Sequence, residues 1–127
     1  MYSDMGKLIL RLMVGGLMLF HGIHKAINGI GFVKGMLSGH GLPEVLSYGV
    51  YVGEILAPLF LIIGWKSRWW AAIMVFNMIT AIYLAHGADI FSITAQGAWS
   101  IELPMLYLLS ALAIVFLGSG KYAASQD

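Results

Sequence analysis

Four long apolar segments dominate the chain, and each is apolar on nearly every side of a helix. They cover residues 8–23, 46–65, 69–85 and 99–117. Each has roughly 16 to 20 residues, near the length that crosses a bilayer as an α-helix. A β-barrel strand would instead show about ten residues of alternating polarity. The pattern therefore predicts an all-α integral membrane protein, a four-helix bundle formed by a single domain over residues 1–127.

The connection between the first and second apolar segments, residues 25–43, has a different pattern. Apolar residues recur there at helical spacing, at Ile27, Ile30, Val33, Met36 and Leu37. This spacing is typical of an amphipathic helix with one apolar face. We expect a short helix lying on the membrane surface in the first external loop.

Basic residues set the predicted orientation of the bundle. One side of the membrane would carry Lys7, Arg11, Lys66, Arg68 and Lys121, and the other side only Lys25 and Lys34. Cytoplasmic loops carry an excess of Lys and Arg. Both termini and the turn at residues 66–68 are therefore predicted to be cytoplasmic.

The composition agrees with this pattern and excludes several chemistries. Hydrophobic residues make up 60% of the chain and charged residues 10%, too few to keep so much apolar surface in water. The net charge of +1 gives no indication of nucleic-acid binding. The chain has no cysteine, which excludes thiolate, disulfide and iron–sulfur chemistry and haem attachment through thioethers. Any redox role must use a bound molecule.

Two charged residues fall inside predicted spans, where an unpaired charge costs about 2.5 to 3.5 kcal/mol on insertion scales. Arg11 lies about one turn into the first span, and Glu54 lies near the middle of the second. Their depths differ by about two turns or less, so we expect an intramembrane ion pair between them. Pro58 has no N–H to donate to the carbonyl of Glu54, which predicts a loosened helix beside the carboxylate.

A second group of polar residues lies near the predicted external ends of the spans. We expect a ligand-binding or proton-relay cluster formed by His21, His24, Lys25, His86 and Glu102. The alternative for each histidine is an interfacial residue that hydrogen-bonds lipid headgroups. The Glu-x-x-His spacing of carboxylate di-metal bundles is missing, so no metal site is predicted. No residue is identified as catalytic.

These residues resemble the DoxX family over essentially the whole chain. The resemblance rests on Arg11-Leu12, Gly15, Phe20-His21-Gly22, Lys25, Gly41-Leu42-Pro43, Glu54, Gly64, Arg68, His86, Glu102 and the closing residues Leu117-Gly118-Ser119-Gly120-Lys121-Tyr122. The family often has Gly-Pro-Gly-Arg in that closing segment, whereas this chain has Ser119 and Lys121 at the second and fourth positions. The resemblance implies a multi-pass protein of the bacterial inner membrane. Founding members of the family are linked to thiosulfate:quinone oxidoreductase or terminal quinol oxidase complexes.

Three functions follow as hypotheses. The leading one is a small, non-catalytic or proton-relay subunit of a quinone oxidoreductase, whose cluster binds a quinone headgroup or moves its protons. Because the chain has no electron carrier of its own, such a subunit would need a quinone, a partner subunit or both. The alternatives are an assembly or scaffolding factor for other membrane proteins, and a small-molecule or proton carrier working as a homo-oligomer. Lipid is the expected surrounding in each case, and nucleic acid is not an expected partner.

Overall fold

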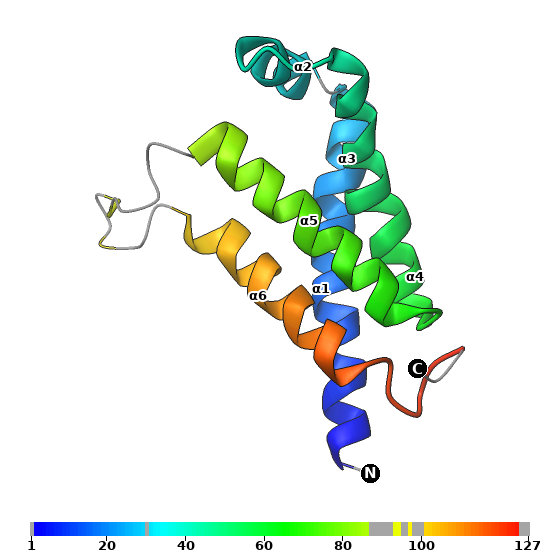
Figure 1. Cartoon of the computed structure of the whole chain (residues 1–127). Coiled ribbons are helices and arrows are strands. Elements are labelled where there is room, and N and C mark those ends of the chain that lie inside the picture. Colours follow the sequence, from blue (N-terminus) through cyan, green and yellow to red (C-terminus); the bar gives the residue numbers. More distant parts are fainter. Residues whose placement is uncertain (1, 30, 87–92, 95–96, 98–100, 125–127) are drawn as a thin grey trace.

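The described part of the computed structural model is built of helices (Figure 1). The structure describes residues 2–29, 31–86, 93, 94, 97 and 101–124. Within them the elements are α1 (Tyr2–Asn28), α2 (Gly31–Gly39), η1 (Glu44–Tyr48), α3 (Gly49–Tyr51), η2 (Val52–Leu56), α4 (Ala57–Ile63), α5 (Ser67–His86) and α6 (Glu102–Leu117). The all-helical prediction is confirmed for the part of the chain described here.

The second apolar segment forms one continuous helix, Val45–Ile63, whose winding changes along its length. It begins as the 3₁₀ helix η1, continues as α3, widens into the π-helix η2 and ends as α4. Glu54 lies inside the π-helix, and Pro58 follows in the first turn of α4. Single π-turns inside helices are frequent at functional sites. The predicted loosening beside Glu54 takes the form of this wider turn.

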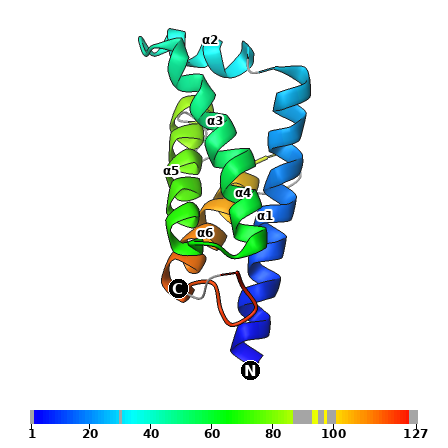
Figure 2. The same ribbon diagram turned by 90° about the vertical axis from the view of Figure 1, so that its right-hand side faces the viewer.

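The helices pack as two pairs, α1 against α4 and α5 against α6, which meet in a shared core (Figures 1 and 2). Its buried side chains are Val14, Met18, Ala57, Leu61, Ala71, Met74, Met78, Tyr107, Ala111 and Ile114. The three alanines are fully buried, which indicates that neighbouring backbones approach closely. Membrane helices associate through such close packing, because lipid supplies no hydrophobic drive between them.

Two glycines set the alignment of α1 against the second helix. A Cβ on Gly22 would lie 2.0 Å from the carbonyl oxygen of Glu54, and a Cβ on Gly15 would lie 2.8 Å from that of Pro58. Only glycine fits at contacts this close. The two helices therefore run antiparallel, with Gly22 level with Glu54 and Gly15 level with Pro58.

The predicted amphipathic helix in the first long connection is confirmed as α2. It lies crosswise to α1 at the end of the molecule away from the chain's two ends (Figure 2). Val33 and Leu37 are buried on its inner side, against Val50, Tyr51 and Leu84. α2 is therefore anchored to the helices below it by the apolar face that the spacing predicted.

At the opposite end, the segment after α6 closes the bundle. The Ser119 hydroxyl lies 2.6 Å from that of Ser67, at the start of α5. The Ala124 amide donates to the carbonyl of Ile63 at 3.1 Å, and the Lys121 amide donates to a carboxylate oxygen of Asp4 at 3.2 Å. The start of α1, the α4–α5 turn and the closing segment are thus joined by hydrogen bonds.

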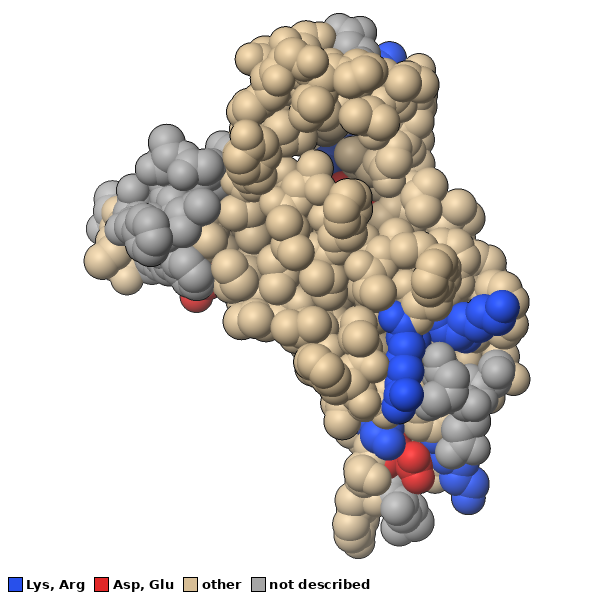
Figure 3. All heavy atoms as spheres, in the orientation of Figure 1, with Lys and Arg blue, Asp and Glu red and all other residues tan. Residues whose placement is uncertain are grey.

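Two helices have the length and hydropathy to cross a membrane, α1 with 27 residues and Val45–Ile63 with 19. α6 is a shorter apolar helix of 16 residues. Large apolar side chains face outward, among them Phe20 at 73%, Phe76 at 73% and Phe116 at 75% exposure. Figure 3 shows a largely uncharged middle, with Lys and Arg gathered at the end that holds both chain ends. The prediction of four spans is met in part: the helices are present, and two of them have the length and hydropathy of a span.

Candidate functional site

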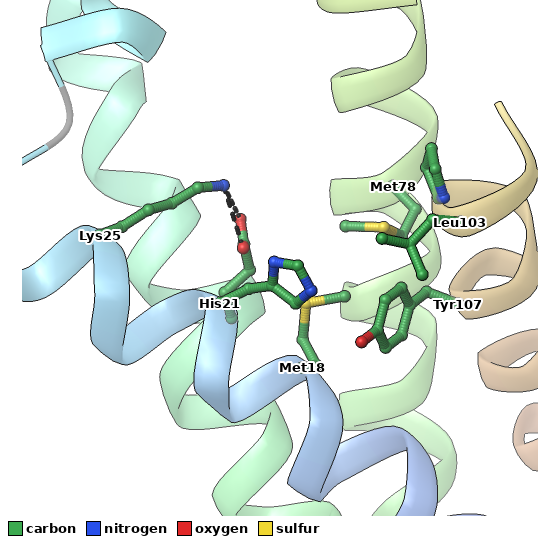
Figure 4. Close-up of a pocket in the computed structure, with 8 residues that line it drawn as sticks. Met18, His21, Lys25, Met78, Leu103 and Tyr107 are labelled. Carbon is green, nitrogen blue, oxygen red and sulfur yellow. Dashed lines mark hydrogen bonds and ion pairs between the residues drawn. The ribbon is translucent and has the colours of Figure 1, made fainter. Parts of the chain in front are cut away.

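A pocket lies between α1, η2, α5 and α6, in the half of the molecule nearer α2 (Figure 4). Its volume is about 210 Å³. The walls combine apolar and polar groups: Met18, His21, Lys25, Glu54, Met78, Leu103, Pro104 and Tyr107. Ligand pockets commonly have this character, mostly apolar with a few polar groups that fix orientation.

An ion pair between α1 and η2 forms one side of the pocket. The Lys25 Nζ lies 3.0 Å and 2.7 Å from the two carboxylate oxygens of Glu54. The Glu54 side chain is 4% exposed and that of Lys25 is 33% exposed, so the carboxylate is buried and the ammonium group reaches it from a wetter position. The side-chain amide nitrogen of Asn77, on α5, donates to the same carboxylate over a longer distance, 3.5 Å. The close approach at Gly22 explains the pair, because Lys25 follows it by one turn of α1.

The predicted ion pair between Arg11 and Glu54 is wrong, because Glu54 pairs with Lys25 instead. Arg11 is fully buried, and its Nη1 donates to the carbonyls of Leu61 at 2.9 Å and Ile62 at 3.3 Å. Its Nη2 donates to the carbonyl of Tyr122 in the closing segment. These carbonyls lie at the C-terminal end of α4, where a cation also meets the negative end of the helix dipole.

His21 and Tyr107 also line the pocket, and the His21 ring lies between the ion pair and Tyr107 (Figure 4). Their rings meet edge to face, with centroids 5.6 Å apart and an angle of 87° between planes. His21 is exposed, whereas Tyr107 is buried. An exposed imidazole and a buried phenol therefore contact each other beside the ion pair. Tyr107 is not among the predicted site residues, although its spacing of four from Leu103 puts both residues on one face of α6.

The other members of the predicted cluster have different surroundings. His24 is exposed, and its Nδ1 lies 3.1 Å from the side-chain nitrogen of Asn28. Glu102 is exposed at the first residue of α6, and neither residue is among the described groups that line the pocket. His86 ends α5, and its side chain lies outside the described residues. Of the five residues, His21 and Lys25 share the pocket, together with Glu54, which we had assigned to a different pair.

The described side chains do not form a metal-binding site. They contain no group of three or more His, Cys, Asp or Glu that could hold an ion. The pocket instead offers one carboxylate, one ammonium group, one imidazole and one phenol between apolar walls. Such groups can donate and accept hydrogen bonds to a small polar ligand and exchange protons with it.

Comparisons with known proteins agree with the residue pattern. The DoxX family model matches residues 6–87, which include His21, Lys25 and Glu54. An uncharacterized protein of Haemophilus influenzae is 33% identical over 120 residues, covering 90% of this chain and 84% of that protein. No solved structure matches the chain. With its two span-length apolar helices, the chain is a small membrane protein that belongs to the DoxX family.

Proposed function

We propose that the chain is a small inner-membrane subunit of a quinone-linked redox system, and that its pocket takes the quinone headgroup. The observation that carries the proposal is the buried carboxylate of Glu54, held by Lys25 in a pocket that His21 and Tyr107 also line. Ionisable groups inside membrane helices are costly and commonly mark a ligand or proton pathway. The proposal keeps the predicted chemistry and replaces part of the predicted residue set.

The size and lining of the pocket fit a quinone headgroup. A cavity of about 150 Å³ is enough to bind benzene, and this pocket has about 210 Å³. Met18, Met78 and Leu103 supply apolar contacts for a flat ring. Polar groups on the facing walls supply hydrogen bonds for ring oxygens. When bound, a quinone accepts electrons and takes up protons.

The chain's own residues would bind that headgroup and hold protons near it. The Lys25 ammonium group has three N–H bonds and uses only part of them on Glu54, so it can also donate to a ring oxygen. The Tyr107 hydroxyl can donate from the other wall. His21 is an exposed residue that lines the pocket, and imidazole is the side chain best suited to exchanging protons near neutral pH.

The proposal includes four membrane crossings in the bacterial inner membrane, with both termini cytoplasmic. Support comes from the outward-facing Phe76 on α5 and Phe116 on α6, and from the basic residues that gather at one end. It also includes a partner. With no cysteine and no electron carrier in the chain, electrons must come from another membrane or peripheral subunit.

Quinone binding to the purified full-length chain tests this function. We expect a short-chain quinone to raise the melting temperature of the chain in detergent. His21→Gln and Glu54→Gln should each weaken the apparent affinity for quinone about tenfold, because that is the effect of losing one good hydrogen bond to a charged or polar group. His24→Gln is the matched control, because His24 lies one turn further along α1 and outside the pocket lining.

Either of two results would contradict the proposal: no stabilisation by quinone, or equal losses in the His21 and His24 variants. Circular dichroism would show whether a variant still folds. A chain that binds no quinone but leaves the membrane in a stable complex with other subunits would fit the assembly hypothesis. Solute or proton flux in reconstituted vesicles would fit the carrier hypothesis.

A further inference from the structure

A second hollow lies at the other end of the molecule, beside the turn between α4 and α5. Its volume is about 290 Å³, and its walls are Trp65, Lys66, Trp69 and Trp70. Three of the chain's four tryptophans are therefore gathered around one lysine. The pocket assigned to quinone does not include any of them.

The aromatic walls are fixed by packing and by the shape of the turn. Gly64 ends α4 in the left-handed region with φ 83°, and Lys66 has φ 50°. Phe60 stacks on Trp70, with centroids 4.7 Å apart, and contacts Trp65 at 5.1 Å. Packing against Phe60 therefore fixes the positions of Trp65 and Trp70 beside the hollow.

The side-chain nitrogens of the residues that line the hollow are hydrogen-bond donors. The Lys66 Nζ lies over the Trp65 ring, 4.9 Å from its centroid, and the structure gives it no carboxylate partner in the described part of the chain. The Trp70 Nε1 is buried and has no acceptor there either. Lysine and tryptophan side chains donate and do not accept. The missing partner must therefore be an acceptor, and the ammonium group favours one that is negatively charged.

The surroundings favour the same sign of charge. Lys7, Arg68 and Lys121 lie at this end of the molecule, where basic side chains gather (Figure 3). The hollow also lies at the first turn of α5, a helix of 20 residues whose dipole is positive there. On α4, the helix that leads into the turn beside the hollow, Leu59 and Ile63 are 42% and 54% exposed and offer an apolar surface for acyl chains.

We propose that this hollow binds the phosphate-bearing headgroup of an anionic phospholipid. Lys66 neutralises the phosphate, Trp70 donates to one of its oxygens, and the exposed Trp65 and Trp69 lie at the boundary with the acyl chains. Tryptophan is enriched at this level of the bilayer, and basic residues near it attract anionic lipids. A soluble anion would not use the apolar flank on α4. The site is independent of quinone binding and stands if that proposal fails.

Tryptophan fluorescence in lipid nanodiscs tests the site directly. In a Trp99→Phe background, every remaining tryptophan lines the hollow. Brominated chains quench tryptophan on contact, so brominated phosphatidylglycerol is compared with equally brominated phosphatidylcholine. We expect the anionic lipid to reach half-quenching at about one-fifth of the mole fraction, the selectivity that one basic residue near the surface supplies.

Matched variants locate that selectivity. Lys66→Gln should remove it, as should Lys66→Asn, which suits the left-handed backbone at this position. Lys34→Gln is the control, because Lys34 also lies over an aromatic ring, 5.0 Å from the Tyr48 centroid, at the other end of the molecule. Trp70→Phe keeps the stacked ring, removes the N–H and should lower the selectivity.

Equal quenching by the two lipids would overturn the proposal, as would loss of selectivity in the Lys34 variant to the same extent as in the Lys66 variants. Inorganic phosphate added to the detergent-solubilised chain separates the two sources of phosphate. We expect it neither to shift the tryptophan emission nor to compete with phosphatidylglycerol. Competition at millimolar concentration would identify a free-anion site instead of a lipid site.

Discussion

At the scale of single residues, Arg11 and Glu54 are stabilised inside the bundle by different kinds of partner. Glu54 has a cationic partner, Lys25, whereas Arg11 binds the carbonyls that end α4. The sequence identified both as buried charges but paired them with each other. The separation of about two turns was estimated correctly, since Arg11 is level with Leu61, seven residues from Glu54. Each of the two residues has a partner nearer than the other. The partners of Arg11 are backbone carbonyls, which a comparison of charged side chains in the sequence cannot identify.

A double-mutant cycle distinguishes the two pairings. Lys25→Met leaves the Glu54 carboxylate buried without its cation, and we expect a loss of about 2 to 3 kcal/mol, less than for a fully buried pair because Lys25 is partly exposed. Adding Glu54→Gln should recover part of that loss, with a coupling of about 1 kcal/mol or more. Unfolding in mixed detergent micelles, followed by circular dichroism, measures both quantities.

The same measurement supplies a control. Arg11→Met and Glu54→Gln should combine additively, within about 0.5 kcal/mol, because the two side chains share no partner in the described structure. Coupling in this second cycle and none in the first would restore the original pairing of Arg11 with Glu54.

At the scale of elements, the hydrophobic pattern predicted which segments are helical but not where each helix ends. α1 runs from Tyr2 to Asn28, well beyond the apolar residues 8–23. Its polar ends stay helical because backbone hydrogen bonds continue there regardless of hydropathy. The spacing of Val33 and Leu37 predicted α2, since a buried stripe on a short helix leaves a clear period. Pro58 predicted a distortion of the second helix near Glu54, but it did not indicate that the distortion would be a π-turn.

The contact between α1 and η2 gives a prediction at this scale. Gly22→Ala places a Cβ 2.0 Å from the backbone carbonyl oxygen of Glu54, so the helices must separate. We expect a loss of about 1 to 3 kcal/mol or more, as for other overpacked contacts, together with a weaker Lys25 to Glu54 pair. Gly16→Ala is the control on the same helix, because a Cβ there meets nothing within 4 Å.

The expected difference between these variants is large. Gly16→Ala should be neutral or stabilise the chain by up to about 1 kcal/mol, since alanine restricts the unfolded chain and favours a helix. Detergent unfolding of both variants measures it. Similar stability for the two would mean that α1 and the second helix do not meet in this register.

At the scale of the whole molecule, depth along the helices was predicted and rotation about their axes was not. Glu102 and Tyr107 are five residues apart, so they project about 140° from each other around α6. The structure turns Leu103 and Tyr107 towards the pocket and leaves Glu102 exposed. Hydropathy carries little information about rotation in a helix that is apolar on every side. Three of the eight lining residues were therefore foreseeable from α1, where Met18, His21 and Lys25 recur at helical spacing.

The orientation of the whole bundle in the membrane is the broadest prediction. Lys7, Lys66, Arg68 and Lys121 lie at the end that holds both chain ends, and α2 with Lys34 lies at the other (Figures 1 and 3). The positive-inside rule places the first end in the cytoplasm and the mouth of the pocket towards the periplasm. Because the chain has no cysteine, a single introduced thiol reports one position without background.

Ser38→Cys and Ala124→Cys place that thiol at exposed positions on opposite ends of the molecule. In intact spheroplasts, we expect a membrane-impermeant maleimide to label the cysteine at position 38 and to reach position 124 only after the membrane is opened. The physical reason is the cost of moving basic residues across the bilayer. The end with both termini carries four of them, whereas the α2 end carries only Lys34 besides Lys25, which is paired with Glu54. Labelling of position 124 alone would invert the bundle and put the pocket mouth in the cytoplasm. Labelling of both positions before opening would mean that the chain crosses the membrane an even number of times between them, so that the second helix, α5 and α6 do not all span it.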